Sequence, residues 1–360
     1  DYTRFVNTKI GSGGHGHVFV GANVPFGLVQ LGPTSIPQTW DWCSGYHDSD
    51  TTVIGFSHTH LEGTGIGDLF DVTVMPVIGS VTYARGEAPA QDATPEEIEA
   101  AVKTGPWSYA DRTKEITRPG YYSVPLTRFG IRAEMTATSR VGLHRYTFPA
   151  SDSSAIVFDL ENGGCWDKAT QTLTEAVDSV TIRGYRYSTG WAKNQKAFFY
   201  AQFSKPFDKF ENMGAYSRID FHTTEGEQIM VKVALSPVSM DGAEANMKAE
   251  MPEWDFEGTV KAAEKAWNEE LSKIKIDTDD AEARTVFYTA MYHSMIQPSV
   301  FNDVNRDYRG ANDQVYKAGN FVNYTTFSLW DTYRAAMPLM TIIHPEKVND
   351  IANTMINIYE

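Results

Sequence analysis

The stretch TTEGEQIMVKVALSPVS, residues 223–239, indicates the fold class because its apolar side chains fall on every second residue. From Ile229 to Leu235 they share one face of an extended chain, as a half-buried β-strand requires. Just before this run, Glu225-Gly226 has the residue chemistry of a hairpin turn. The stretch therefore predicts a turn followed by a strand.

Runs of the same kind recur between Asp1 and about residue 245. They include YYSVPLTRFG (121–130), GIRAEMTAT (130–138), SAIVFDLEN (154–162) and KAFFYAQF (196–203), with Gly, Pro, Asn and Asp between them. Many short strands separated by turn residues favour an antiparallel β-sandwich. The stretch ATPEEIEAAVKTG (93–105) is an exception, since its Thr-Pro start and terminal glycine predict a helix.

The spacing of the apolar residues changes after about residue 250. Three groups have the three-and-four spacing of a helix face: Ala262, Ala266 and Trp267; Ala283, Val286, Phe287, Ala290 and Met291; and Ile351, Ala352, Met355, Ile356 and Tyr359. We expect a helix at each group. The last helix reaches Glu360 without a C-cap glycine, so we expect the segment to be incomplete.

Size and charge limit the class of protein. A chain of 360 residues with 42% hydrophobic and 21% charged residues fits a soluble globular protein of two domains that does not span a membrane. The net charge of -15 argues against nucleic acid as a partner, because phosphate binding needs clustered Lys and Arg. Cys43 and Cys165 lack CxxC spacing and leave the redox compartment open.

Polar side chains gather in GFSHTHLEGTG, residues 55–65, directly before an apolar run. His58 and His60 are two residues apart, so on a strand both imidazoles would face one side as a possible metal pair, with Glu62 as a third ligand. The alternative is that both histidines make hydrogen bonds beside a loop. The glycine-rich GSGGHGHVF at residues 11–19 lacks nucleotide-loop spacing, and we interpret it as a flexible turn before a strand.

Two aromatic stretches are further candidates for a site. QTWDWCSGY, residues 38–46, alternates tryptophans with Asp41 and Cys43. Aromatic faces beside carboxylates suit carbohydrates, although a structural tryptophan pair at the sandwich edge explains the pattern equally well. NYTTFSLWDTYRAAMPL, residues 323–339, begins a helix in which Ser328 and Asp331 have the spacing of a capping box. From composition alone, capping and core packing account for that stretch.

Three long motifs resemble one known family. They are GSGGHGHVFVGANVPFGLVQLGP (11–33), GFSHTHLEGTGIGD (55–68) and FSLWDTYRAAMPL (327–339). In this order and separation they resemble the calcium-dependent exo-α-mannosidases of glycoside hydrolase family 92, especially those of gut Bacteroides. The resemblance covers nearly the whole chain.

The resemblance implies a multidomain β + α protein. The expected parts are an antiparallel β-sandwich (1–245), a helical linker (246–278) and the first helices of an (α/α)6 barrel (279–360). It also implies a mannose site where sandwich and barrel meet, so that the polar side chains after residue 57 would face the substrate. The expected location is periplasmic or extracellular, since DYTRF at the start would follow a removed leader.

The resemblance also implies residue roles and a mechanism. The sugar, a terminal α-mannose of an N-glycan or mannan, would be hydrolysed with inversion by a carboxylic acid and a carboxylate. A Ca²⁺ cofactor would bind two sugar hydroxyls. We expect the acid, the base and the metal ligands to follow residue 360, so this segment would hold none of them. The expected substrate-binding residues are His60, Glu62, Gly63, Thr64, Trp330 and Asp331, with Trp42 and Cys43 as further candidates for the wall.

Two alternatives remain open from the sequence. One is a sugar-binding β-sandwich without catalysis. The other is a different family with a sandwich and an (α/α)6 barrel, acting on glucosides by hydrolysis or phosphorolysis. Oligomeric state and linkage specificity are not determined by the residues.

Overall fold

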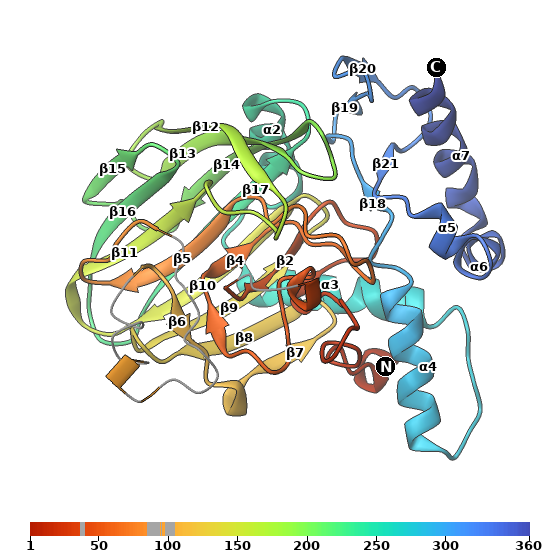
Figure 1. Cartoon of the computed structure of the whole chain (residues 1–360), viewed down its shortest axis with the longest axis horizontal. Helices are drawn as coiled ribbons and strands as arrows, with labels where there is room; N and C mark the ends of the chain where they lie inside the picture. Colours follow the sequence, from red (N-terminus) through yellow and green to blue (C-terminus); the bar gives the residue numbers. More distant parts are fainter. Residues whose placement is uncertain (37–39, 85–93, 95, 98–104) are drawn as a thin grey trace.

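The computed structural model describes the chain except for residues 37–39, 85–93, 95 and 98–104. In the described part, two antiparallel sheets come first in the chain and helices follow. Figure 1 shows the sheets on one side and α4 to α7 on the other. The predicted sandwich followed by helices is confirmed.

The first sheet has the strand order β1-β2-β4-β5-β11-β16-β15 within the described residues. The bounds of its strands are Ala22–Asn23 (β1), Gln30–Thr34 (β2), Gly55–Ser57 (β4), Thr73–Ile78 (β5), Ser151–Asp159 (β11), Lys209–Met213 (β15) and Tyr216–Thr223 (β16).

The second sheet has the order β12-β13-β14-β17-β10-β9-β8-β7, again for the part of the chain that is described. Its strands are Ile116–Arg118 (β7), Tyr121–Leu126 (β8), Ile131–Ala137 (β9), Val141–Phe148 (β10), Lys168–Ala176 (β12), Thr181–Thr189 (β13), Gln195–Phe203 (β14) and Glu227–Ser236 (β17). The predicted turn at Gly226, whose φ is 76°, joins β16 to β17.

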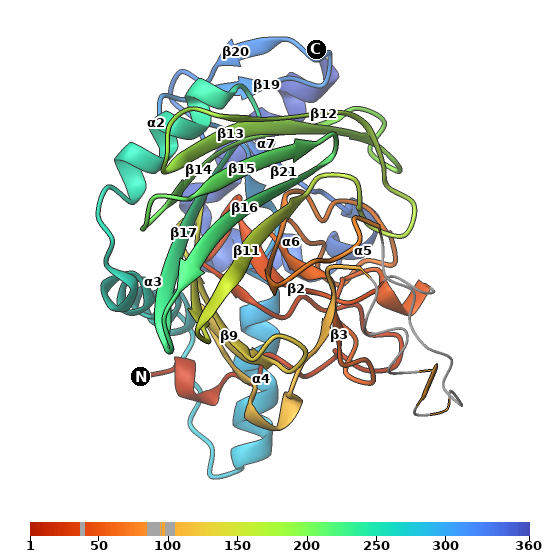
Figure 2. The same ribbon diagram turned by 90° about the vertical axis from the view of Figure 1, so that its left-hand side faces the viewer.

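One large apolar core fills the space between the two sheets. Phe158 of β11 stacks on Phe199 of β14 with ring centroids 5.7 Å apart, so the facing sheets are in direct contact. The outer face of β17 is buried as well, because α2 (Met240–Glu250) packs on it. Figure 2 shows α2 along the outside of the second sheet. The half-buried strand expected at β17 is therefore covered on both faces in its second half.

The remaining short elements lie outside the two sheets. Three strand pairs are β3 (Thr52–Val53) with β6 (Ser108–Tyr109), β18 (Ser299–Val300) with β21 (Tyr324–Thr325), and β19 (Asp307–Arg309) with β20 (Val315–Lys317). The described residues also form three short 3-10 helices, Thr3–Phe5, Trp40–Trp42 and Arg112–Lys114. The other helices are α3 (Phe256–Leu271), α4 (Ala281–His293), α5 (Leu329–Thr332), α6 (Ala336–Ile343) and α7 (Pro345–Tyr359).

Three of the helices begin with a side-chain cap. Ser239, Asp255 and Asp280 each accept a hydrogen bond from the backbone N–H three residues on, at the starts of α2, α3 and α4. The helix expected over residues 93–105 lies mainly outside the described residues. Among its described residues, Thr94 and Glu97 each accept a hydrogen bond from the other's backbone N–H, which is the pattern of a capping box.

The apolar face expected on α4 is confirmed in part: Met291 is buried and Phe287 packs against the same core, but Ala283 and Ala290 are exposed. Val286 is half exposed, whereas Tyr288 and Tyr292 are buried. The tyrosines can take these places because their hydroxyls find partners, Tyr288 at the carbonyl of Ile274 and Tyr292 near the side chain of Asn23. In the other two expected helices Trp267 and Ile351 are buried, but other members of the expected faces are exposed: Ala262, Ala352, Ile356 and Tyr359.

Candidate functional site

The main candidate site is a cavity of ≈ 640 Å³ where the sandwich meets the helical part. Three segments form most of its walls: residues 61–69 after β4, residues 191–195 leading into β14, and residues 325–331 between β21 and α5; His17 and Trp40 complete the lining. A cavity of this size accommodates a small organic ligand. Of the predicted residues, it brings together Gly63, Thr64, Trp330 and Asp331.

Three exposed tryptophans line this cavity: Trp191 and Trp330 belong to two of these segments, and Trp40 packs against the loop after β4. Trp330 is 81% exposed, Trp191 73% and Trp40 48%. Trp40 donates its indole N–H to the carbonyl oxygen of Gly65 at 2.9 Å, which fixes the ring against the loop after β4. Large aromatic faces open to solvent offer the apolar faces of a sugar ring a stacking surface.

Asp331 lies in the first turn of α5, where a carboxylate is favoured by the helix dipole. The hydroxyl of Ser328 donates to Oδ2 of Asp331, and the N-terminus of α5 has no side-chain cap. The predicted capping by Ser328 is therefore wrong, because its hydroxyl donates to the carboxylate instead of accepting from a backbone N–H. Oδ1 of Asp331 makes no hydrogen bond within the described part of the chain.

His58 and His60 do not form a metal pair. Both are fully buried, and burial lowers the pKa of each to about 4. His58 contacts the carbonyl of Val72 and, at 2.9 Å, Nε2 of His144; His60 contacts the carbonyl of Gln30. The alternative of hydrogen-bonding histidines is the one observed. Among the described residues, no three His, Cys, Asp or Glu side chains cluster as metal ligands.

Glu62 faces a smaller neighbouring cavity of ≈ 140 Å³, which Thr64 also lines. Its Oε2 accepts the backbone N–H of Phe19 at 2.5 Å, and its Oε1 lies 2.7 Å from Nδ1 of His293. Both carboxylate oxygens are thus engaged with the protein. His60, between this residue and the sheet, lines neither cavity.

Trp42 and Cys43 lie apart from the main cavity. The Trp42 indole stacks on His47 with centroids 4.4 Å apart and donates to Asp50 at 2.8 Å. Cys43 is fully buried, and burial together with the neighbouring Cys165 thiol raises its pKa to about 12. Of the described residues in this stretch, Trp40 is the one that lines the cavity.

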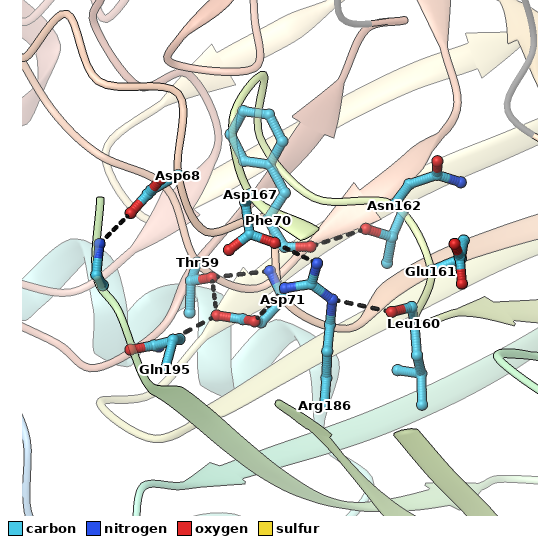
Figure 3. Close-up of polar contacts among 12 residues, drawn as sticks. Thr59, Asp68, Phe70, Asp71, Leu160, Glu161, Asn162, Asp167, Arg186 and Gln195 are labelled. Atoms are coloured by element: carbon cyan, nitrogen blue, oxygen red, sulfur yellow. Dashed lines mark hydrogen bonds and ion pairs between the residues drawn. The ribbon is translucent and has the colours of Figure 1, made fainter. Parts of the chain in front are cut away.

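A buried charged cluster supports two of the cavity walls (Figure 3). Arg186 has no exposed surface; it donates to Oδ1 of Asp71 at 2.9 Å, to Asp167 and to the carbonyl of Leu160. Asp71 also accepts from Gln195 of the cavity wall at 3.3 Å. The cluster therefore joins β13 to the loops before β5 and after β11.

Sequence reasoning missed four residues of the site and its support: His17, Asp68, Arg186 and Trp191. His17 lines the cavity, packs edge-on against Trp40, and accepts the N–H of Gly63 at 2.8 Å through its carbonyl. The glycine-rich turn thus contributes to the wall.

For Trp191, the sequence held a usable signal of a site residue. It lies in the polar run TGWAKNQ, and a turn between two strands gives an indole no core to fill. Nothing in the sequence marks Arg186.

Models of two known domains match the sequence. Residues 5–236 match the Glycosyl hydrolase family 92 N-terminal domain, and residues 242–360 match the Glycosyl hydrolase family 92 catalytic domain. A curated relative, an uncharacterized secreted glycosidase of Arthroderma benhamiae, is 26% identical over 374 residues, which are 93% of this chain and 45% of that protein.

Solved structures are similar over the whole length of the chain. A family GH92 alpha-mannosidase from Bacteroides thetaiotaomicron is 35% identical with a TM-score of 0.89, over 99% of this chain and 49% of that one. The same protein has been solved in complex with mannoimidazole. A family GH92 inverting mannosidase from that organism, 22% identical with a TM-score of 0.83 over 100% of this chain and 48% of that one, shares the fold. The chain spans about half the length of these relatives.

Proposed function

Because the chain belongs to glycosyl hydrolase family 92, we propose that the whole protein containing it is an exo-acting α-mannosidase. Its substrate is a glycan that ends in α-mannose, such as an N-glycan or a mannan, and the bond is hydrolysed with inversion. One observation carries the proposal. A chain 35% identical to an alpha-mannosidase has a cavity lined by three exposed tryptophans and a carboxylate with a free oxygen.

The residues of this chain bind the terminal mannose. Asp331, whose Oδ2 is held by Ser328, accepts hydrogen bonds from sugar hydroxyls through Oδ1. Trp330 beside it offers an apolar face to the ring. Gly63 has a φ of 67° and open space around it, so the backbone there comes close to a ligand without a side chain intervening. Thr64 adds a hydroxyl at the same wall.

We assign no catalytic acid or base to the described residues. An inverting pair needs one protonated and one ionised carboxyl about 6.5–9.5 Å apart across the bond. Glu62 is occupied by Phe19 and His293, and Asp68 by two backbone N–H groups. We propose that the pair lies in the part of the whole protein outside this chain, and that the domains divide near residues 245 and 278.

We propose that the Ca²⁺ ligands also lie in the part of the whole protein outside this chain. The described residues provide no cluster of three possible ligands, so they do not fit the metal and no step proposed for them uses it. Calcium takes six to eight oxygen ligands, which a single carboxylate such as Asp331 cannot supply.

We also propose a periplasmic or extracellular location. The curated relative is described as secreted. None of the helices in the described residues has the length and apolar character needed to cross a membrane.

The test is hydrolysis by the whole protein of α-1,2-, α-1,3-, α-1,4- and α-1,6-mannobiose, with the matching α-glucobioses as controls. NMR of the first product formed gives the anomer. Release of β-mannose from at least one mannobiose is the expected result. Binding of mannose without hydrolysis would favour a sugar-binding protein, and cleavage of the glucobioses alone would favour the glucoside-active families.

A further inference from the structure

Trp191 combines a large exposed ring with a firmly held backbone. It lies in the loop that joins β13 to β14, and its indole lines the main cavity. Unlike Trp107 and Trp267, which are fully buried, this indole contributes little to the core. A tryptophan that remains largely exposed beside a cavity is typical of a ligand contact.

The backbone of this loop is fixed by Asp68. Its Oδ1 accepts the N–H of Trp191 at 2.9 Å, and its Oδ2 accepts the N–H of Ala192 at 2.7 Å. Asp68 is only 3% exposed, so water competes little for these charge-assisted bonds. Gly190 is needed for the close approach, because a Cβ there would lie 2.3 Å from Oδ1 of Asp68. The indole is therefore held on a backbone already in place before a ligand arrives.

The loop is also the shared wall of two cavities. Ala192, Gln195 and Thr325 line both the main cavity and a second one of ≈ 440 Å³. Polar side chains such as Asn194 and Arg309 line that second cavity. A ligand that begins between Thr64 and Asp331 and extends into the second cavity crosses the boundary that this loop forms together with Thr325 of β21.

We propose that Trp191 is the stacking surface for the sugar that follows the terminal mannose, on the leaving-group side of the scissile bond. This assignment rests on the proposed function. The terminal mannose occupies the part of the main cavity near Asp331, and the next sugar lies on the indole with its hydroxyls toward the second cavity. Trp191 thereby favours oligosaccharides over substrates whose leaving group is not a sugar.

The test compares two substrates of the whole protein. One is the mannobiose that the wild type cleaves best; the other is α-mannosyl fluoride, whose leaving group carries no sugar. Trp191→Ala should lower kcat/KM for the mannobiose by about tenfold or more and change that for the fluoride by less than about twofold. Trp191→Phe should keep most of the mannobiose activity, because it retains an aromatic face. Trp166→Ala, at an exposed tryptophan outside both cavities, is the matched control and should change neither.

The outcomes separate this assignment from the proposed function. Equal losses on both substrates, or no loss on either, in an enzyme whose wild type is active overturn the assignment of Trp191 alone. A wild type that cleaves neither substrate overturns the proposed function and this assignment with it. Melting temperatures of all variants check folding, and Trp191→Leu replaces Trp191→Ala if the latter does not fold.

Discussion

Nδ1 of His293 in α4 lies 2.7 Å from Oε1 of Glu62 in the sandwich loop after β4. The other ring nitrogen, Nε2, lies 3.2 Å from the carbonyl oxygen of Ile10. Both ring nitrogens therefore face hydrogen-bond acceptors. Only the positively charged ring, with a hydrogen on each nitrogen, can donate to both of them. Burial opposes the charge, but the close contact with the Glu62 carboxylate outweighs it and raises the pKa of His293 above its ordinary value.

This pair predicts a pH-dependent contribution to stability. A pKa raised by folding gives stabilisation that is complete below the ordinary value of about 6.5 and is lost as pH rises through the folded-state value. His293→Gln should thus lower the free energy of unfolding by about 1–2 kcal/mol near pH 6 and by less near pH 9. Denaturant unfolding at several pH values measures it. In a Glu62→Gln background the same substitution should have little effect; an unchanged effect there would assign the stabilisation to another contact.

The buried pair of Asp71 and Arg186 predicts a large loss of stability. Asp71→Asn removes one of the two carboxylates that compensate a guanidinium without exposed surface, and should cost about 3 kcal/mol. Glu175→Gln is the control, since it breaks the half-exposed pair between Glu175 of β12 and Arg183 of β13 and should cost less than about 0.5 kcal/mol. Urea unfolding compares the two. Equal losses would show that the buried cluster contributes no more than a surface pair.

Asp331 distinguishes sugar binding from local helix stabilisation. If Oδ1 binds mannose hydroxyls, Asp331→Ala in the whole protein should lower kcat/KM about 10²-fold or more, about 3 kcal/mol. The melting temperature should change little. Asp331→Asn keeps the size and one acceptor but removes the charge, and it should also lose activity. A pair of variants with full kcat/KM and a stability loss of about 1 kcal/mol would remove Asp331 from the site.

Gly65 tests the role of Trp40 without changing the tryptophan. A Cβ at Gly65 would lie 2.5 Å from Nε1 of Trp40, so Gly65→Ala must displace the indole from the cavity wall. We expect kcat/KM for α-mannosides to fall by about tenfold. Gly319→Ala is the control, because nothing lies within 4 Å of a Cβ there and its φ is not positive. Activity equal to that of the control would exclude Trp40 from substrate binding.

Chelation tests the calcium proposal. EDTA should abolish α-mannoside hydrolysis by the whole protein, and added Ca²⁺ should restore it. Since the described residues contain no metal cluster, Asp331→Ala should leave the Ca²⁺ affinity unchanged, as measured by calorimetry. Turnover that resists EDTA would contradict the requirement, and a weakened affinity would place Asp331 among the ligands.

The site was only partly predictable. Gly63, Thr64, Trp330 and Asp331 were named from motifs and meet at one cavity although more than 260 residues separate the two pairs. Trp42 and Cys43 were expected at the same wall and instead lie outside it, because the 3-10 helix Trp40–Trp42 turns one tryptophan toward the cavity and the other onto His47. This single helical turn decides which of the two tryptophans faces the cavity. The orientation of the turn is set by the loop after β4, which Trp40 contacts.

The sequence by itself determined the sandwich, the change to helices after β17 and the presence of polar and aromatic candidates. These features follow from local periodicity and turn chemistry, which neighbouring residues carry. Tertiary structure alone decided that His58 and His60 are buried partners of His144 and Gln30, that Arg186 supports the cavity, and that Trp191 faces it. The physical reason is that burial and pairing depend on segments far apart in the chain, and a side chain's chemistry does not specify which distant segment will cover it.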